Sequence, residues 1–143
     1  MILKLFKKVF VISLLMLSYS SAQDGNVYLN VWGFDEIEGE LSIGLYKNTE
    51  TFLKRGQGVE GIHIKVADSL VSYVFKNIQP GTYAIAIYHD ENVNREFDRN
   101  FLGMPSEDYV FSNYAKGFLG PPTFEAAMFT HSDSTKIDLD INK

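Results

Sequence analysis

The 143-residue sequence contains no cysteine. This absence excludes disulfides, thiolate chemistry and lipid attachment at a lipobox cysteine. Basic residues are also in deficit, since 13 Lys and Arg stand against 18 Asp and Glu and the net charge is −5. Such a balance argues against nucleic acid and against anionic membrane surfaces as partners. Without disulfides, the fold has to be held by the packing of its core.

No apolar run is long enough to span a membrane comfortably. The apolar run near the N-terminus instead follows a group of lysines and precedes small residues. Three lysines within the first eight residues precede an apolar run at 9–17, and Ser20 and Ala22 place small residues before Gln23. This is the layout of a secretory signal peptide, with an uncleaved anchor as the alternative. We therefore expect a signal peptide at 1–22, a periplasmic or extracellular location and no transmembrane segment in the mature chain.

The remainder, 23–143, is dominated by alternation of apolar and polar residues and has a length that suits one domain. The leader carries three lysines and no acid, so removing it changes the net charge from −5 to −8. Seven short stretches are candidate strands, most of them alternating in this way: 26–34, 39–48, 61–68, 70–78, 81–89, 124–131 and 135–142. Gly, Asn, Asp and Pro separate them. The pattern predicts an all-β fold, a single antiparallel seven-stranded immunoglobulin-like or prealbumin-like β-sandwich.

The stretch 81–89 differs from the others because both of its faces are apolar. Such a strand has to be covered on both sides, and the sandwich core covers only one. The segment 90–123 has no strand or helix pattern, yet it carries eight large apolar residues: Phe97, Phe101, Leu102, Tyr109, Phe111, Tyr114, Phe118 and Leu119. We expect these residues to be buried. The segment would then be a long ordered loop between the last strands, covering Ala84, Ala86 and Tyr88.

An acidic loop follows the two-faced strand and is a candidate calcium site. The sequence HDENVNREFD, at 89–98, carries an acidic or amide side chain at every second position: Asp90, Asn92, Asn94, Glu96 and Asp98. These residues match positions 1, 3, 5, 7 and 9 of a calcium-binding loop, where several oxygens converge on a hard cation.

Two positions of the acidic loop depart from that pattern. The sixth, normally Gly, is Arg95, and the twelfth, which supplies a bidentate carboxylate, is Phe101. Four other acids are candidates for the missing ligand: Glu91, Glu107, Asp108 and Glu125. The alternative interpretation is that the Asp and Asn side chains cap successive turns by local hydrogen bonds.

His89 and a later polar group are candidate ligand-binding residues. His89 ends the two-faced strand, where it could bind a ligand or act with Asp90 in a small cleft enzyme; the alternative is a hydrogen bond to a nearby carboxylate or carbonyl. Asn113, Tyr114 and Lys116 could offer polar groups to a ligand, or they could tie the loop to the scaffold.

The sequence contains no GxSxG, P-loop, GxGxxG or HExxH motif, so no catalytic residue is assigned. We therefore expect an exported envelope binding module without catalysis, whose partner is a protein, a glycan or a small ligand. One alternative is the same module stabilised by Ca²⁺ in the 90–98 loop. Another is a cleft enzyme that uses His89 and Asp90.

Several motifs between Ile78 and Phe129 occur in a fixed order that is specific to one family. They are a PGxY turn at 80–83, HDxNxN at 89–94, GMP at 103–105, FSN at 111–113 and GPPTFEAA at 120–127. Together they resemble the exported bacterial domain of unknown function family 2141. The resemblance implies a secreted or periplasmic β-sandwich and no established activity.

Two details qualify this resemblance. Arg95 stands where a glycine is expected after the second asparagine of HDxNxN. The turn NIQPGTYAI, at 77–85, is also similar to the one in transthyretin-like and collagen-adhesin (Cna) B-type domains. That similarity supports the sandwich and implies nothing about activity.

Overall fold

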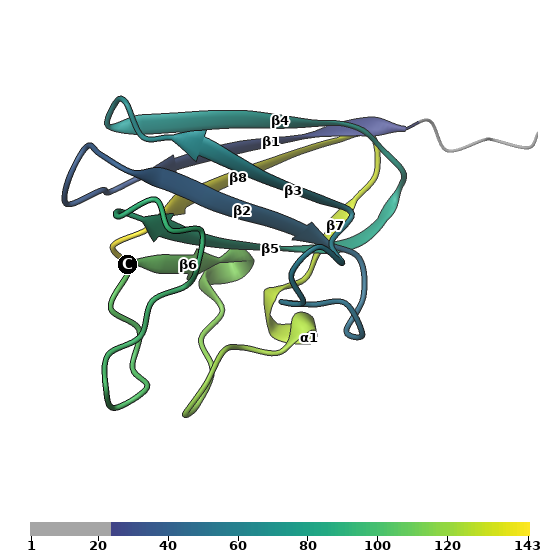
Figure 1. Cartoon of the computed structure of the whole chain (residues 1–143). Coiled ribbons are helices and arrows are strands. Elements are labelled where there is room, and N and C mark those ends of the chain that lie inside the picture. Colours follow the sequence, from purple (N-terminus) through teal and green to yellow (C-terminus); the bar gives the residue numbers. More distant parts are fainter. Residues whose placement is uncertain (1–23) are drawn as a thin grey trace, which may run out of the picture.

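The computed structural model describes residues 24–143, so the leader expected at 1–22 lies outside the described residues. The described part contains eight strands, one 3₁₀ turn and one short helix (Figure 1). Their bounds are β1 Gly25–Trp32, β2 Glu40–Tyr46, β3 Glu60–Lys65, β4 Leu70–Ile78, β5 Gly81–Asp90, β6 Tyr109–Phe111, η1 Ser112–Tyr114, α1 Phe124–Ala127, β7 Phe129–His131 and β8 Ser134–Asp140. None of these helices is long and apolar enough to cross a bilayer.

The strands form two sheets that face each other (Figure 1). The first sheet has the order β4-β1-β8, and the second has the order β3-β2-β5-β6, with β7 also pairing with β5. The expected all-β fold built from two packed layers is therefore confirmed.

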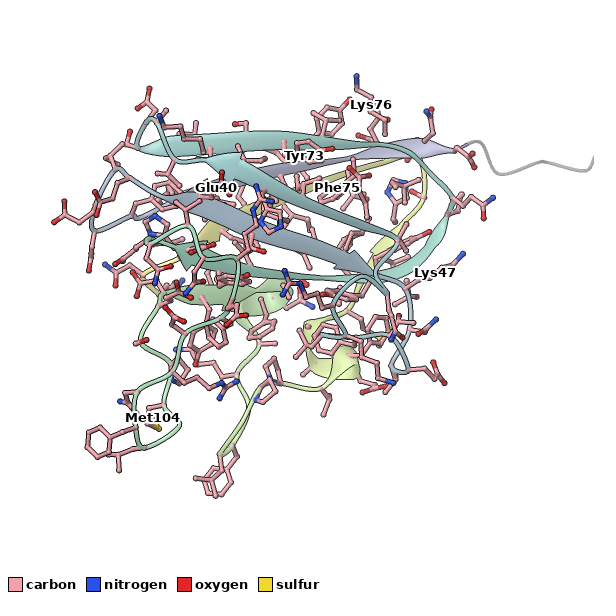
Figure 2. The ribbon with its side chains drawn as sticks, viewed as in Figure 1. Glu40, Lys47, Tyr73, Phe75, Lys76 and Met104 are labelled. Atoms are coloured by element: carbon pink, nitrogen blue, oxygen red, sulfur yellow. The ribbon has the colours of Figure 1, made fainter. Side chains whose placement is uncertain are left out.

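The core between the sheets is built from the alternating residues that the sequence places on one face. In β1, Val27, Leu29 and Val31 are buried, while Tyr28 between them is exposed. Phe75 of β4 is also fully buried, and its neighbour Lys76 points away from the sheets (Figure 2). In β1 and β4, alternation thus predicts correctly which side of the strand packs inward.

The strand count and the strand directions differ from the prediction. Strand β8 runs parallel to β1, with Leu29 opposite Ile137 and Val31 opposite Leu139, so the first sheet is mixed rather than antiparallel. Residues 24–143 form eight strands rather than seven, because Tyr109–Phe111 in the expected loop pairs with β5. The expected strand at 124–131 is half helix: Phe124–Ala127 forms α1 and only Phe129–His131 is extended.

The second apolar face of β5 is covered, as expected, but by three different segments. Ala84 packs in a small cluster with Phe111 from the long loop, with Phe124 of α1 and with Phe52 from the β2–β3 connection. Further along β5, the ring of Phe97 lies 5.4 Å from that of Tyr88. The 90–123 segment therefore supplies part of this cover, and α1 and the β2–β3 connection supply the rest.

Two parts of the long loop are exposed, contrary to the expected burial of Phe101, Leu102, Phe118 and Leu119. Tyr109, also expected to be buried, is 44% exposed, and the first exposed part includes Met104 as well. The exposed fractions are 95% for Phe101, 72% for Leu102, 60% for Met104, 94% for Phe118 and 95% for Leu119. We call the first three residues the first tip and the last two the second tip. Both loops extend away from the sheets in the same direction (Figure 1), and Met104 lies far from the core (Figure 2). The expectation fails because both loops project beyond the cover of β5.

Candidate functional site

The acidic loop begins at Asp90, the last residue of β5, which is fully buried. Its two carboxylate oxygens accept hydrogen bonds from the backbone N–H groups of Asn94, at 3.1 Å, and Arg95, at 2.7 Å. Arg95 has a φ of +61° and Val93 a φ of +58°, so two non-glycine residues adopt the left-handed conformation. Asp90 therefore holds the chain in the sharp turn that a calcium-binding loop makes at its sixth position.

The remaining members of the loop are linked by their own hydrogen bonds. The side-chain oxygen of Asn92 accepts from the backbone N–H of Asn94 at 3.0 Å, and that of Asn94 accepts from the backbone N–H of Glu96 at 2.7 Å. The carboxylate of Asp98 accepts from the side-chain amides of Asn92, at 2.6 Å, and Asn94, at 3.0 Å. These are the local bonds that the turn-capping interpretation predicts. The side chains of Asn92, Asn94 and Asp98 are thus linked to one another just after the end of β5.

Glu107 is brought against this loop from nine residues further along the chain. Its Oε2 accepts a hydrogen bond from the backbone N–H of Asp98 at 3.0 Å. The side chain is only 7% exposed, and its Oε1 is buried without a hydrogen-bond partner. Burial raises the pKa of Glu107, the nearby carboxylates of Asp98, Asp90 and Glu91 raise it further, and the bond from Asp98 lowers it. Of the four acids considered from the sequence, Glu107 is the one that meets the loop in this way.

The arginine at the sixth position of the loop faces an acid of the neighbouring strand. Glu40 of β2 lies opposite Asp90 of β5, and its Oε2 is 3.8 Å from the Nε of Arg95. The side chain of Arg95 is 57% exposed, so this pair contributes little to stability. It places one positive charge beside an otherwise acidic region.

The structure places His89 in the interior rather than at a cleft. His89 is fully buried, and its Nε2 lies 2.7 Å from the carbonyl oxygen of Glu38. Its ring also packs edge-on against Phe34, with 5.4 Å between ring centres. His89 therefore joins β5 to the loop between β1 and β2. This is the hydrogen bond to a nearby carbonyl that was the alternative to a ligand-binding role.

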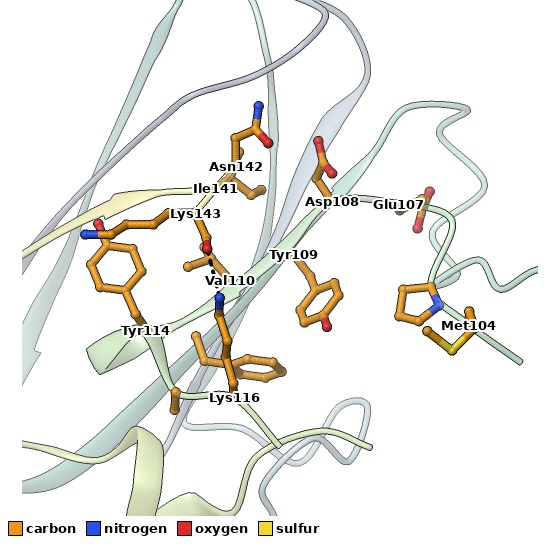
Figure 3. A pocket seen from close by; sticks show the side chains of 13 residues that line it. Met104, Glu107, Asp108, Tyr109, Val110, Tyr114, Lys116, Ile141, Asn142 and Lys143 are labelled. Carbon is orange, nitrogen blue, oxygen red and sulfur yellow. Dashed lines mark hydrogen bonds between the residues drawn. The ribbon is translucent and has the colours of Figure 1, made fainter. Parts of the chain in front are cut away.

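A cleft of about 360 Å³ lies beside β6, between the long loop and the residues after β8 (Figure 3). Tyr114 and Lys116 line it, as do Tyr109 and Met104. The Nζ of Lys116 donates to the carbonyl oxygen of Lys143 at 3.0 Å, across this cleft (Figure 3). The two loops that carry the tips thus border one hollow of the surface.

Asn113, Tyr114 and Lys116 do not converge on a single point. The side-chain amide of Asn113 donates to the carbonyl oxygen of Met128 at 2.6 Å. The hydroxyl of Tyr114 accepts from the backbone N–H of Asp140 at 3.0 Å. Each contact fastens the long loop to a different part of the scaffold, which is the alternative role considered from the sequence.

No group of three or more His, Cys, Asp or Glu within residues 24–143 has the spacing of a metal site. The oxygens around the acidic loop come from both carboxylates and amides, so they form a mixed set rather than a cluster of acids alone. The sequence predicts the loop residues, and Glu107 is one of four acids that it offers for the missing carboxylate ligand. Its burial was not readable from the sequence, because it depends on the path of the chain between 98 and 107.

Gly39 allows the β1–β2 loop to approach the start of the acidic loop. Its φ is +70°, and a Cβ at this position would lie 2.4 Å from the carbonyl oxygen of Asp90. We expect Gly39→Ala to lower the free energy of unfolding by about 1–3 kcal/mol, because it combines a left-handed backbone with a clash. Urea unfolding measures this.

The matched control for this change is Gly61→Ala in β3. A Cβ at Gly61 has open space around it, and its backbone is extended. We expect this variant to be as stable as the original protein or slightly more stable. Equal stability of the Gly39 and Gly61 variants would contradict the close approach at Asp90.

Comparison with known proteins identifies one family. The family model described as "uncharacterized protein conserved in bacteria", DUF2141, matches residues 29–138, which extend from β1 to β8. No curated protein and no solved structure matches the chain. The match covers more than half of the sequence, including the acidic loop, Glu107 and both tips. The chain therefore belongs to the DUF2141 family of uncharacterized bacterial proteins.

Proposed function

We propose that the protein is an exported binding module of the cell envelope, without catalysis, and that the two tips form its binding surface. The observation that carries this proposal is the exposure of Phe101, Phe118 and Leu119, each above 90%. Export rests on the leader at 1–22, and the location is periplasmic or extracellular. We also propose that the two sheets are a variant of the immunoglobulin-like or prealbumin-like sandwich.

Exposed large apolar side chains in a group point to interaction rather than to folding. Single exposed apolar residues are normal on protein surfaces, whereas contiguous apolar patches usually mark interaction sites. Aromatic residues and Met are enriched in protein interfaces, where they fill pockets of the partner. The tips present two Phe, two Leu and one Met, which is the composition of such anchors.

The first tip is held in place before any partner binds. The side-chain oxygen of Asn100 accepts from the backbone N–H groups of Leu102, at 2.9 Å, and Met104, at 3.1 Å. The guanidinium of Arg99 donates to the carbonyl oxygen of Gly103 at 3.1 Å. A loop that is already ordered loses less conformational entropy on binding, which favours affinity.

The second tip lies on a similarly tight turn. A Cβ at Gly117 would lie 2.2 Å from the carbonyl oxygen of Gly120, so the chain closes tightly around Phe118 and Leu119. Both tips therefore stand on turns that present their side chains outward.

The partner that fits these tips best is an envelope protein with apolar pockets. A glycan would need convergent polar groups, and the tips offer only apolar side chains. The negative charge of the mature chain disfavours an anionic membrane surface. An apolar small ligand in the cleft beside β6 remains the other candidate, because Met104 and Tyr109 line that cleft.

The enzyme alternative has less support from the geometry. His89 and Asp90 are both fully buried, and both oxygens of Asp90 are engaged by backbone N–H groups. A general base has to reach the proton that it abstracts, and neither side chain lines the cleft.

The experiment is capture of a partner from envelope extract by the immobilised protein and by the double variant Phe101→Ser/Phe118→Ser. Truncating a buried aromatic anchor costs about 2 kcal/mol or more of binding free energy. We therefore expect the double variant to recover at least about tenfold less of any partner that binds the tips.

The control is Ile37→Ser/Val59→Ser, which changes two half-exposed apolar residues in other loops. It should recover as much partner as the original protein. All variants should melt at the same temperature. Equal recovery by the tip variant would contradict the proposal, and binding of the original protein to phosphatidylcholine vesicles, lost in the tip variant, would reassign the partner to lipid.

A further inference from the structure

The acidic loop and Glu107 together carry an inference about a bound ion. The loop lacks the carboxylate that the twelfth position of a calcium-binding loop supplies. Phe101 occupies that position, and the Phe101 side chain is almost fully exposed. Glu107 reaches the same loop from outside and is anchored there by the backbone N–H of Asp98. We propose that the 90–98 loop binds Ca²⁺ and that Glu107 supplies the missing carboxylate ligand.

The buried oxygen of Glu107 is the observation that points to a ligand. A buried carboxylate oxygen without a hydrogen-bond partner is costly, and native proteins rarely keep one without a reason. Within residues 24–143 the two ion pairs are Arg95–Glu40 and Lys136–Asp138. Neither involves Glu107 or Asp98. A divalent cation would supply the partner that Oε1 lacks.

The electrostatics of the region favour a cation for the same reason. Asp90, Asp98 and Glu91 lie near enough to Glu107 to disfavour its charged form. Like charges held close together repel one another, most strongly where they are buried, and a bound Ca²⁺ offsets that repulsion.

The oxygens of the loop remain free to bind an ion although they already accept hydrogen bonds. An amide oxygen has two lone pairs, and those of Asn92 and Asn94 each accept one backbone N–H. The carboxylate of Asp98 has about four lone-pair sites and accepts from two side-chain amides. The backbone carbonyl of Glu96 at the seventh position and the carboxylate of Asp90 add further oxygens. The number of available oxygen ligands is then close to the six to eight that Ca²⁺ takes.

The acids alone do not stand at metal-binding spacing within the described part of the chain. Binding therefore has to draw Glu107 and the loop closer together, which couples the ion to the order of the 90–108 segment. Because this segment also carries the first tip, the ion would stabilise the base of that loop. The inference goes beyond the proposed partner binding and does not depend on it.

The experiment is thermal unfolding of the protein in 1 mM CaCl₂ and in EGTA, together with calorimetric titration with CaCl₂. A ligand that binds the folded state raises its stability by mass action. We expect the melting temperature to rise by about 5–10 °C with Ca²⁺ if the dissociation constant is about 10 µM. MgCl₂ should have a smaller effect, because Mg²⁺ keeps its water and demands octahedral geometry.

The decisive variant is Glu107→Gln, which keeps an oxygen for the bond from Asp98 and removes the charge. We expect it to melt in EGTA at the same temperature as the original protein or higher, because the unpaired buried charge is gone, and to bind Ca²⁺ at least about tenfold more weakly. A merely structural role of Glu107 would instead lower the melting temperature in EGTA and leave the calcium shift unchanged.

Three further variants separate the outcomes. Glu50→Gln, an exposed acid outside the loop, should retain the full calcium shift, and Asp90→Asn should lose it. The tip variant Phe101→Ser/Phe118→Ser should also retain it, so failure of the partner proposal leaves this result unchanged. The inference is overturned if Ca²⁺ produces neither a shift nor heat of binding, or if Glu107→Gln binds Ca²⁺ as tightly as the original protein.

Discussion

Replacing Phe75 by Ala is expected to lower the free energy of unfolding by about 3–5 kcal/mol. Phe75 is fully buried in the core between the sheets, and its ring packs edge-on against Tyr73 with 5.0 Å between ring centres. Removing the ring loses its apolar burial and leaves a cavity that close-packed neighbours fill only partly. A domain of this size has a total stability of about 5–15 kcal/mol, and no disulfide is present to offset the loss.

Urea unfolding followed by the fluorescence of the single tryptophan, Trp32, measures this change. The control is Lys76→Ala, the next residue of β4, whose side chain is exposed. We expect the control to change the unfolding free energy by less than about 0.5 kcal/mol. A loss below about 1 kcal/mol for Phe75→Ala would contradict its position at the centre of the core.

Replacing Ser112 by Val is expected to lower the free energy of unfolding by about 2–4 kcal/mol. Ser112 is fully buried at the start of η1, where it joins β5 to α1. Its Oγ accepts from the backbone N–H of Ile85 at 2.9 Å and donates to the carbonyl oxygen of Ala127 at 2.5 Å. Val cannot hydrogen-bond and is one heavy atom larger than Ser, so the variant leaves both backbone groups buried without partners and also crowds a fully buried site.

The same urea unfolding measures this variant, and amide hydrogen exchange at Ile85 localises the effect. The N–H of Ile85 should exchange faster in Ser112→Val, because its acceptor is lost. The control is Ser106→Val, an exposed serine in the long loop. If both serine variants are equally stable, then the hydroxyl of Ser112 does not link β5 to α1.

The strands that could be predicted are those in which buried and exposed residues alternate regularly over several positions. Val27, Leu29 and Val31 alternate with Tyr28, Asn30 and Trp32 in β1, and this local pattern is enough to assign both the strand and its buried face. Strand β6 has only three residues, Tyr109–Phe111, and three residues carry no period. Its pairing with β5 is a property of the folded chain.

The helix α1 had a local signal that the strand prediction overrode. Thr123 caps it by accepting from the backbone N–H of Ala126 at 3.3 Å, and Glu125 lies in the first turn. A cap followed by Glu, Ala and Ala favours a helix. The sequence beginning at Phe124 favoured a strand. In the folded chain the helix is stabilised instead, because it packs Phe124 and Ala127 against Ala84.

The candidate site was half predictable. The sequence names the loop residues from Asp90 to Asp98 and treats Arg95 as a departure from the glycine expected at the sixth position, whereas in the structure Arg95 adopts the left-handed conformation that such a glycine would have. The selection of Glu107 over the other acids depends on the return of the chain from the first tip to β6. Asn100 and Gly103 are local signals for the turn itself, but they do not specify which acid the returning chain places against the loop.

Periodicity and turn chemistry, which act over a few residues, were sufficient to predict the all-β class, most of the buried faces and the acidic loop, and the resemblance of the ordered motifs between Ile78 and Phe129 indicated the family. The folded chain decided what depends on distant partners: the parallel pairing of β8 with β1, the cover of Ala84, the burial of Glu107 and the exposure of the two tips. The physical reason is that an apolar residue is equally apolar in a core and at a loop tip. Only the complete packing determines which residues the core has room to bury.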